Sequence, residues 1–225
     1  MEPNLKLLQL RELLAERFPG VRMRADELSA KTRATWPTGL AQFDALLHGG
    51  LPKGVITEFV GEKPNCGTAS VIHALLRQAH ETNQVIALID GCDSFDLAAV
   101  EQEVLSRLLW IRCHNASEAM KCTDILLRDR NLPLVILDLK FNPVKELRKV
   151  PGTIWYRLQR VIEQTSSAFL VITPRAMVSS AEIRLVLRSQ FSLEDVERDQ
   201  TELQEKLSVD LAHERKAADH LRQTA

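Results

Sequence analysis

The sequence predicts an α/β fold in which a mostly parallel central sheet is covered by helices on both faces. Short apolar runs without polar alternation indicate strands that are buried on both sides. Stretches with helical spacing separate most of these runs, as crossover connections between parallel strands require. A glycine-containing loop joins the first run to a helix, which is typical of a ligand-binding edge. The strand candidates are residues 55–60, 85–90, 109–113, 134–139, 168–173 and 183–188.

The elements divide the chain into three parts. Leucines at mixed three- and four-residue steps over residues 4–18 predict an amphipathic helix, and a polar linker follows it, so residues 1–34 form an N-terminal appendage. Residues 35–191 form the core domain, with helices expected over 69–80, 97–107, 117–128 and 153–164. Residues 192–225 are strongly charged, lack glycine and proline, and predict a helical tail. Its apolar positions Leu203, Leu207 and Leu211 are candidate partner contacts.

The composition excludes several classes of protein. The chain has 225 residues, a net charge of −1 and four cysteines without a C-x-x-C pair, so a disulfide scaffold is not expected. No apolar run approaches the roughly 20 residues that span a bilayer, and charges interrupt any signal-peptide core. We therefore expect a cytoplasmic protein with free thiols, no membrane contact and no metal site.

The loop after the first strand has the context of a phosphate-binding loop without its chemistry. Such loops follow the pattern G-x-x-x-x-G-K-[ST], in which the lysine reaches the phosphates and the hydroxyl holds Mg²⁺. Here Gly61 begins the loop, the second glycine, Gly67, comes one residue late, and Thr68 follows it where a lysine is needed. The sequence predicts a degenerate nucleotide site with weak anion binding at most, and no bound cofactor.

The residues before this loop resemble a known family. Thr38-Gly39, Phe43-Asp44, Gly49-Gly50-Leu51-Pro52 and Gly54 match in order the segment that precedes the phosphate loop in RecA recombinases. The resemblance runs from about residue 35 to 191 and implies the RecA-like P-loop NTPase fold. It also implies positions for nucleotide chemistry. Asp138 matches the Mg²⁺-associated acid, but Cys92 replaces the catalytic glutamate and Pro174 replaces the phosphate-sensing glutamine.

The same resemblance implies two DNA-contacting loops. The first corresponds to residues 140–152, where the candidate DNA contacts are Lys140, Lys145, Arg148 and Lys149. Phe141 lies among them, and Trp155 and Tyr156 follow, so stacking on bases and packing in the core are both open for these aromatics. The second loop, at about residues 174–181, is too short to reach into a filament axis.

A short, loop-degenerate RecA-like chain resembles the ImuA family of SulA/RecA-like proteins. That resemblance implies a non-enzymatic accessory of error-prone translesion DNA synthesis in the SOS response. The implied partners are an ImuB-like Y-family polymerase homologue, a DnaE-type polymerase complex, RecA and DNA. Two alternatives remain open: an active RecA-type or circadian-clock-type ATPase with a divergent loop, and a regulator of recombination or cell division.

Overall fold

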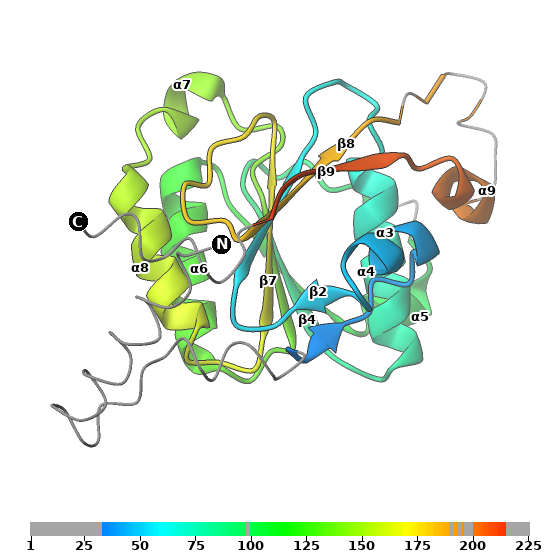
Figure 1. The fold of residues 1–225 in the computed structure, drawn as a ribbon, viewed down its shortest axis with the longest axis horizontal. Helices are drawn as coiled ribbons and strands as arrows, with labels where there is room; N and C mark the ends of the chain where they lie inside the picture. Colours follow the sequence, from blue (N-terminus) through cyan, green and yellow to red (C-terminus); the bar gives the residue numbers. More distant parts are fainter. Residues whose placement is uncertain (1–32, 98–99, 190, 193–194, 196–199, 215–225) are drawn as a thin grey trace, which may run out of the picture. The chain divides into compact units, whose positions relative to one another are not determined.

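The computed structural model describes residues 33–97, 100–189, 191–192, 195 and 200–214, all within one compact unit (Figure 1). The helix expected over residues 4–18 lies outside the described part of the chain. A sheet of seven strands has the order β5-β4-β6-β7-β3-β8-β9. Its strands are β3 (Ile56–Val60), β4 (Ile86–Asp90), β5 (Leu108–Arg112), β6 (Leu134–Asp138), β7 (Ala168–Thr173), β8 (Ile183–Leu187) and β9 (Val209–Glu214).

All neighbouring strands of this sheet are parallel except β8 and β9, which pair antiparallel. The six strands from β3 to β8 lie within one or two residues of the strands expected from the apolar runs. The α/β fold with a mostly parallel sheet is therefore confirmed, and it is consistent with a RecA-like domain.

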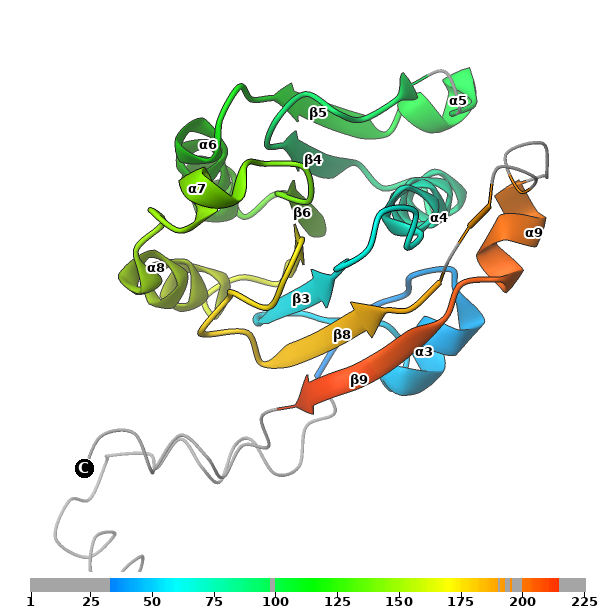
Figure 2. The same ribbon diagram turned by 90° about the horizontal axis from the view of Figure 1, so that it is seen from above.

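Helices cover both faces of the sheet, and Figure 2 shows the two layers from above. Helices α4 (Thr68–Glu81) and α5 (Gln102–Leu105) lie on one side with α3 (Ala41–Leu46), and α6 (Ala116–Asp129), α7 (Val144–Leu147) and α8 (Gly152–Ile162) lie on the other. Strand side chains alternate between the two cores. Leu134 and Ile136 of β6 pack into the first, and Val135 and Leu137 pack into the second.

Local signals explain where several elements begin. Asn115 caps α6 by accepting a hydrogen bond from the Glu118 amide, and the Glu118 carboxylate accepts one in return from the His114 amide. A short hairpin of β1 (Thr35–Trp36) and β2 (Leu51–Pro52) precedes β3. Gly50 at this hairpin has a φ of 125°, and a side chain there would collide with the Trp36 carbonyl.

The C-terminal region corrects one expectation. The helical tail predicted over residues 192–225 is wrong for its described part, because the chain forms a six-residue helix, α9 (Gln200–Glu205), and then strand β9. Strand β9 pairs with β8 in the register Leu185↔Leu211 and Leu187↔Val209 and forms one edge of the sheet. The core sheet thus extends beyond residue 191, where the sequence placed the end of the core domain.

A buried carboxylate in the middle of β3 connects the end of β7, the loop after it and the start of β8. Glu58 of β3 is fully buried and accepts hydrogen bonds from the Thr173 hydroxyl at 2.9 Å and the Met177 amide at 2.8 Å. It also accepts from the Val178 amide and from Arg184 of β8, at 3.1 and 2.5 Å. Four donors compensate the desolvation of this charge, which would otherwise be costly.

We expect Glu58→Ala to lower the free energy of unfolding by about 3–5 kcal/mol, because it leaves Arg184 and two loop amides without their acceptor. Urea unfolding measured by circular dichroism checks this value. Glu62→Ala is the matched control, since Glu62 is exposed and lies 3.9 Å from Arg188. Equal stability of the two variants would contradict a structural role for the Glu58 network.

Candidate functional site: a closed phosphate loop

The candidate phosphate loop, residues 61–68, connects β3 to α4 at the carboxyl edge of the sheet (Figure 2). Counted from Gly61, the lysine of the phosphate-loop pattern falls on Gly67 and its hydroxyl falls on Thr68. Gly67 is the N-cap residue of α4 and has a left-handed φ of 93°. On this count the hydroxyl position holds Thr68 and the lysine position holds Gly67, whereas the count from the second glycine put Thr68 at the lysine position; neither count places a lysine there.

The structure fills the space that a lysine at position 67 would need. A Cβ atom on Gly67 would overlap the Leu207 side chain and would lie 3.0 Å from the Phe191 ring. Leu207 is only 2% exposed and belongs to the same core cluster as Cys66 of the loop. Only glycine fits here, because both the backbone conformation and the close packing exclude a side chain.

Leu207 was expected to be a partner contact, and its burial corrects that prediction. Leu203 is half-buried on α9, and Leu211 of β9 is the one member of the predicted set that is exposed. The three leucines therefore do not form a single exposed stripe.

Lys140 also differs from its predicted role as a DNA contact. It is buried, and its ammonium group donates hydrogen bonds to the carbonyls of Gly61 and, at 3.0 Å, Lys63. The side chain thus reaches from the end of β6 into the neighbouring loop, where it satisfies two backbone acceptors. This position removes Lys140 from the surface and makes it part of the loop.

Two acids lie side by side at the ends of β4 and β6, where Asp90 and Asp138 are register partners. Asp90 accepts hydrogen bonds from the Phe95 amide at 2.8 Å and the Ser94 hydroxyl at 3.3 Å, so it organises the loop after β4. Asp138 accepts one from the Lys140 amide at 2.9 Å. Burial raises the pKa of Asp138 to about 6, and the neighbouring Asp90 carboxylate contributes in the same direction.

Cys92 follows Asp90, at the position where the RecA resemblance places a catalytic base. Burial raises the pKa of this thiol above its ordinary value, and the nearby Asp90 carboxylate raises it further. A neutral thiol is neither a strong base nor an activated nucleophile. Among the described residues no group of three or more His, Cys, Asp and Glu side chains is placed to hold a metal ion.

The remaining predicted DNA contacts lie on the surface. Lys145 of α7 and Arg148 and Lys149 after it are exposed, as are Phe141, at 62%, and Tyr156, at 43%. Trp155 is buried in the core, so the packing interpretation holds for that residue. Residues 140–164 contain six basic and two acidic side chains in a chain of net charge −1. Positive charge is therefore concentrated in this segment.

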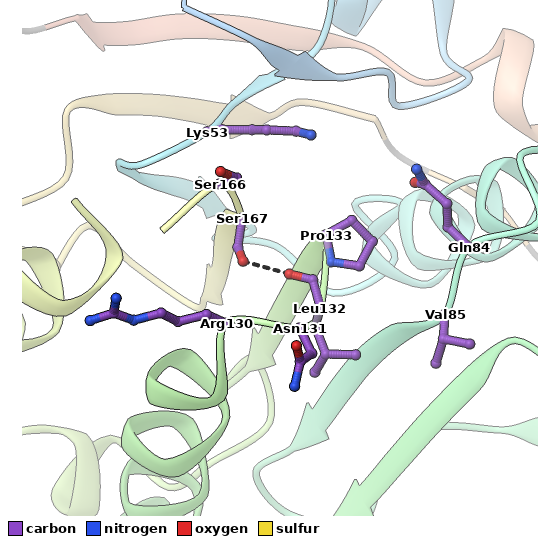
Figure 3. Close-up of a pocket in the computed structure, with 9 residues that line it drawn as sticks. All are labelled: Lys53, Gln84, Val85, Arg130, Asn131, Leu132, Pro133, Ser166 and Ser167. Carbon is purple, nitrogen blue, oxygen red and sulfur yellow. Dashed lines mark hydrogen bonds between the residues drawn. The ribbon is translucent and has the colours of Figure 1, made fainter. Parts of the chain in front are cut away.

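A groove lies at the edge of the sheet opposite the candidate loop, where β4, β6 and β7 begin. This open groove of about 520 Å³ is lined by nine residues, which Figure 3 shows: Lys53, Gln84, Val85, Arg130, Asn131, Leu132, Pro133, Ser166 and Ser167. The charged ends of Lys53 and Arg130 point in opposite directions (Figure 3), and Arg130 donates to Gln164 at 3.1 Å. The two cations do not converge on one ligand position.

The raised pKa of Asp138 generates a stability prediction. Its folded-state pKa of about 6 lies above the ordinary 3.8, so stability is greatest when the group is protonated and falls as pH rises from about 4 to 6. Asp138→Asn removes this loss and keeps an acceptor for the Lys140 amide. We expect the variant to melt at a higher temperature than the parent at about pH 8 and at an equal temperature at about pH 4. A difference that does not change with pH would contradict the assignment.

Comparison with known proteins finds partial sequence similarity to RecA proteins. No family model matches the chain. It is 27% identical over 121 residues to the RecA protein of Picosynechococcus and 26% identical over 160 residues to that of Desulfotalea psychrophila. The matches cover 53% and 68% of this chain, but only 34% and 45% of those relatives. RecA from Prochlorococcus marinus is 28% identical over 118 residues, which is 31% of its length. The chain is therefore an α/β protein with partial sequence similarity to RecA, and it spans less than half the length of these relatives.

Proposed function

We propose that this chain is a non-catalytic RecA-like accessory protein of the SOS response to DNA damage. In this role it supports error-prone translesion synthesis by binding an ImuB-like Y-family polymerase homologue within a DnaE-type polymerase complex, RecA, or both. One observation carries the non-catalytic part of this proposal. Leu207 and Phe191 occupy the space beside Gly67, where a nucleotide-binding loop needs its lysine. The accessory role and the partners rest on the resemblance to the ImuA family.

The other nucleotide positions support the same conclusion. Phosphoryl transfer requires a cation on the phosphates, a group that positions the nucleophile and stabilisation of developing charge. Cys92 offers a thiol with a raised pKa, and Pro174 has neither a side-chain amide nor a backbone N–H. Lys140, which reaches into the loop from the end of β6, is bound to backbone carbonyls instead of facing outward.

We expect no ATP turnover by the purified chain, because no lysine stands at the phosphate-loop position and Lys140 is bound to backbone carbonyls. Restoring lysine with Gly67→Lys is expected to leave turnover absent, since the new side chain collides with Leu207. Titration with a fluorescent ATP analogue and Mg²⁺, followed by a phosphate-release assay, measures both. Micromolar binding with steady phosphate release by the unmodified chain would disprove the non-catalytic proposal.

The accessory role is tested by direct binding. We expect the purified chain to retain the Y-family polymerase homologue encoded in the same genome in a pull-down, with or without added ATP. Leu211→Asp probes the exposed edge of the sheet, and it is expected to weaken retention without changing the melting temperature, because Leu211 is 40% exposed. Retention of RecA alone would favour the regulator alternative, and retention of neither protein would contradict the accessory role.

A second candidate activity is DNA binding by the segment around α7. Lys145, Arg148 and Lys149 are exposed and close in sequence, and exposed Phe141 offers a ring for stacking. Strand-exchange chemistry is not proposed, because the loop after β7 is short and Glu58 holds its Met177 and Val178 amides. The expected activity is therefore salt-sensitive binding of single-stranded DNA without sequence preference.

We expect the triple variant Lys145→Ala, Arg148→Ala, Lys149→Ala to weaken single-stranded DNA binding and to flatten its salt dependence. Each phosphate contact contributes about 0.7 to the slope of log K against log salt, so three contacts contribute about 2. Fluorescence anisotropy at several salt concentrations measures this slope. Replacing Lys53, Lys121 and Arg130 removes the same charge from other surfaces and should leave the slope higher. Equal slopes for the two triple variants would rule out a specific surface.

A further inference from the structure

We infer that the C-terminal region forms a strap, defined by Ser189, Phe191, Leu207 and Ser208, that holds the candidate phosphate loop closed. The loop is therefore a docking position for the residues that follow β8 and precede β9. This inference concerns a contact within the chain, so it holds whether or not the proposed partners bind.

Backbone and side-chain contacts fix the strap in two places. The Phe191 amide donates a hydrogen bond to the Asn65 carbonyl of the loop at 3.1 Å. The Ser208 amide donates to the Ser189 hydroxyl at 2.8 Å, which joins the start and the end of the strap. The strap is therefore attached both to the loop and to itself.

An ion pair reinforces the outer part of the same region. Lys206, next to Leu207, lies 2.5 Å from the Asp195 carboxylate, which also accepts a hydrogen bond from the Ser192 amide at 2.9 Å. These contacts hold the residue before Leu207 against the segment that follows Phe191. These contacts hold Leu207 in its position against Gly67.

Lys140 closes the loop from the side of β6. A Cβ atom on Gly61 would lie 3.2 Å from its ammonium nitrogen, 3.0 Å from the Thr68 methyl and 2.7 Å from the Cys66 sulfur. An anion-binding loop directs amide groups at its ligand and keeps its cation free. Here Lys140 is bound to loop carbonyls, and the Leu207 and Phe191 side chains pack at the N-terminus of α4 beside Gly67. The closed state thus needs no ligand to hold it.

Cys66 provides a direct probe of the strap, because its thiol is 1% exposed and lies in the same core cluster as Leu207. The second buried thiol, Cys113, belongs to the core on the other face of the sheet and reports global unfolding. We propose to measure the rate of maleimide labelling of each cysteine in the full chain by peptide mass spectrometry. Leu207→Asp should speed labelling of Cys66 by about ten- to a hundredfold, the factor expected when one buried leucine is lost, and leave Cys113 unchanged.

Leu211→Asp is the matched control, since Leu211 lies four residues on and is exposed. It should leave both labelling rates at their parent values. An unchanged Cys66 rate in a folded Leu207→Asp variant would overturn the strap. If Leu207→Asp instead exposes both thiols together, Leu207→Ala decides: faster labelling of Cys66 than of Cys113 supports the strap, and equal acceleration overturns it. ATP turnover and partner retention are separate measurements, so failure of the strap is distinguishable from failure of the proposed function.

Discussion

The buried carboxylate of Glu58 is the interaction on which the arrangement of β3, β7 and β8 depends. It joins β3 to the end of β7, to the loop after β7 and, through Arg184, to β8. Strand β8 in turn carries β9, and the chain entering β9 carries Leu207 to the phosphate loop. A charge placed in the centre of the sheet thus determines the position of an edge strand and, through it, the closure of a loop. Because four donors surround this carboxylate, the arrangement tolerates little movement.

Strands β3 to β8 could be predicted from the sequence because they are continuous apolar runs, and burial on both faces leaves few alternatives for such runs. Strand β9 was missed although it carries a signal. Leu207, Val209 and Leu211 recur at every second residue, which is the period of a strand, but the wider spacing of apolar residues from 193 to 211 favoured a helix. Helix α5 is shorter than expected, because among the described residues of 97–107 the α-helix covers Gln102–Leu105. The local sequence pattern contains no information on whether residues 209–214 pair with β8, so it could not exclude a helix there.

The candidate site was predictable in its composition and not in its contacts. The departure of residues 61–68 from the phosphate-loop pattern can be read directly from the sequence, and the positions of Asp90 and Asp138 follow from the ends of their strands. The burial of Lys140 could not be read, because a lysine in a basic segment ordinarily faces solvent. Nor could Leu207 be assigned to the loop, since 140 residues separate it from Gly67 and only the completed sheet brings them together. The positions of Lys140 and Leu207 both follow from tertiary packing, which the sequence pattern does not show.

The close approach of Leu207 to Gly67 also bears on how this loop can change over time. Restoring the lost lysine would place a long cation against a filled core position, so the reversal requires a compensating change more than a hundred residues away. Residue 67 is thus subject to the rules of interior packing, where volume and backbone conformation decide which residues are tolerated. Substitutions at residue 67 and at residue 207 are therefore coupled, because a larger side chain at one position needs a smaller one at the other.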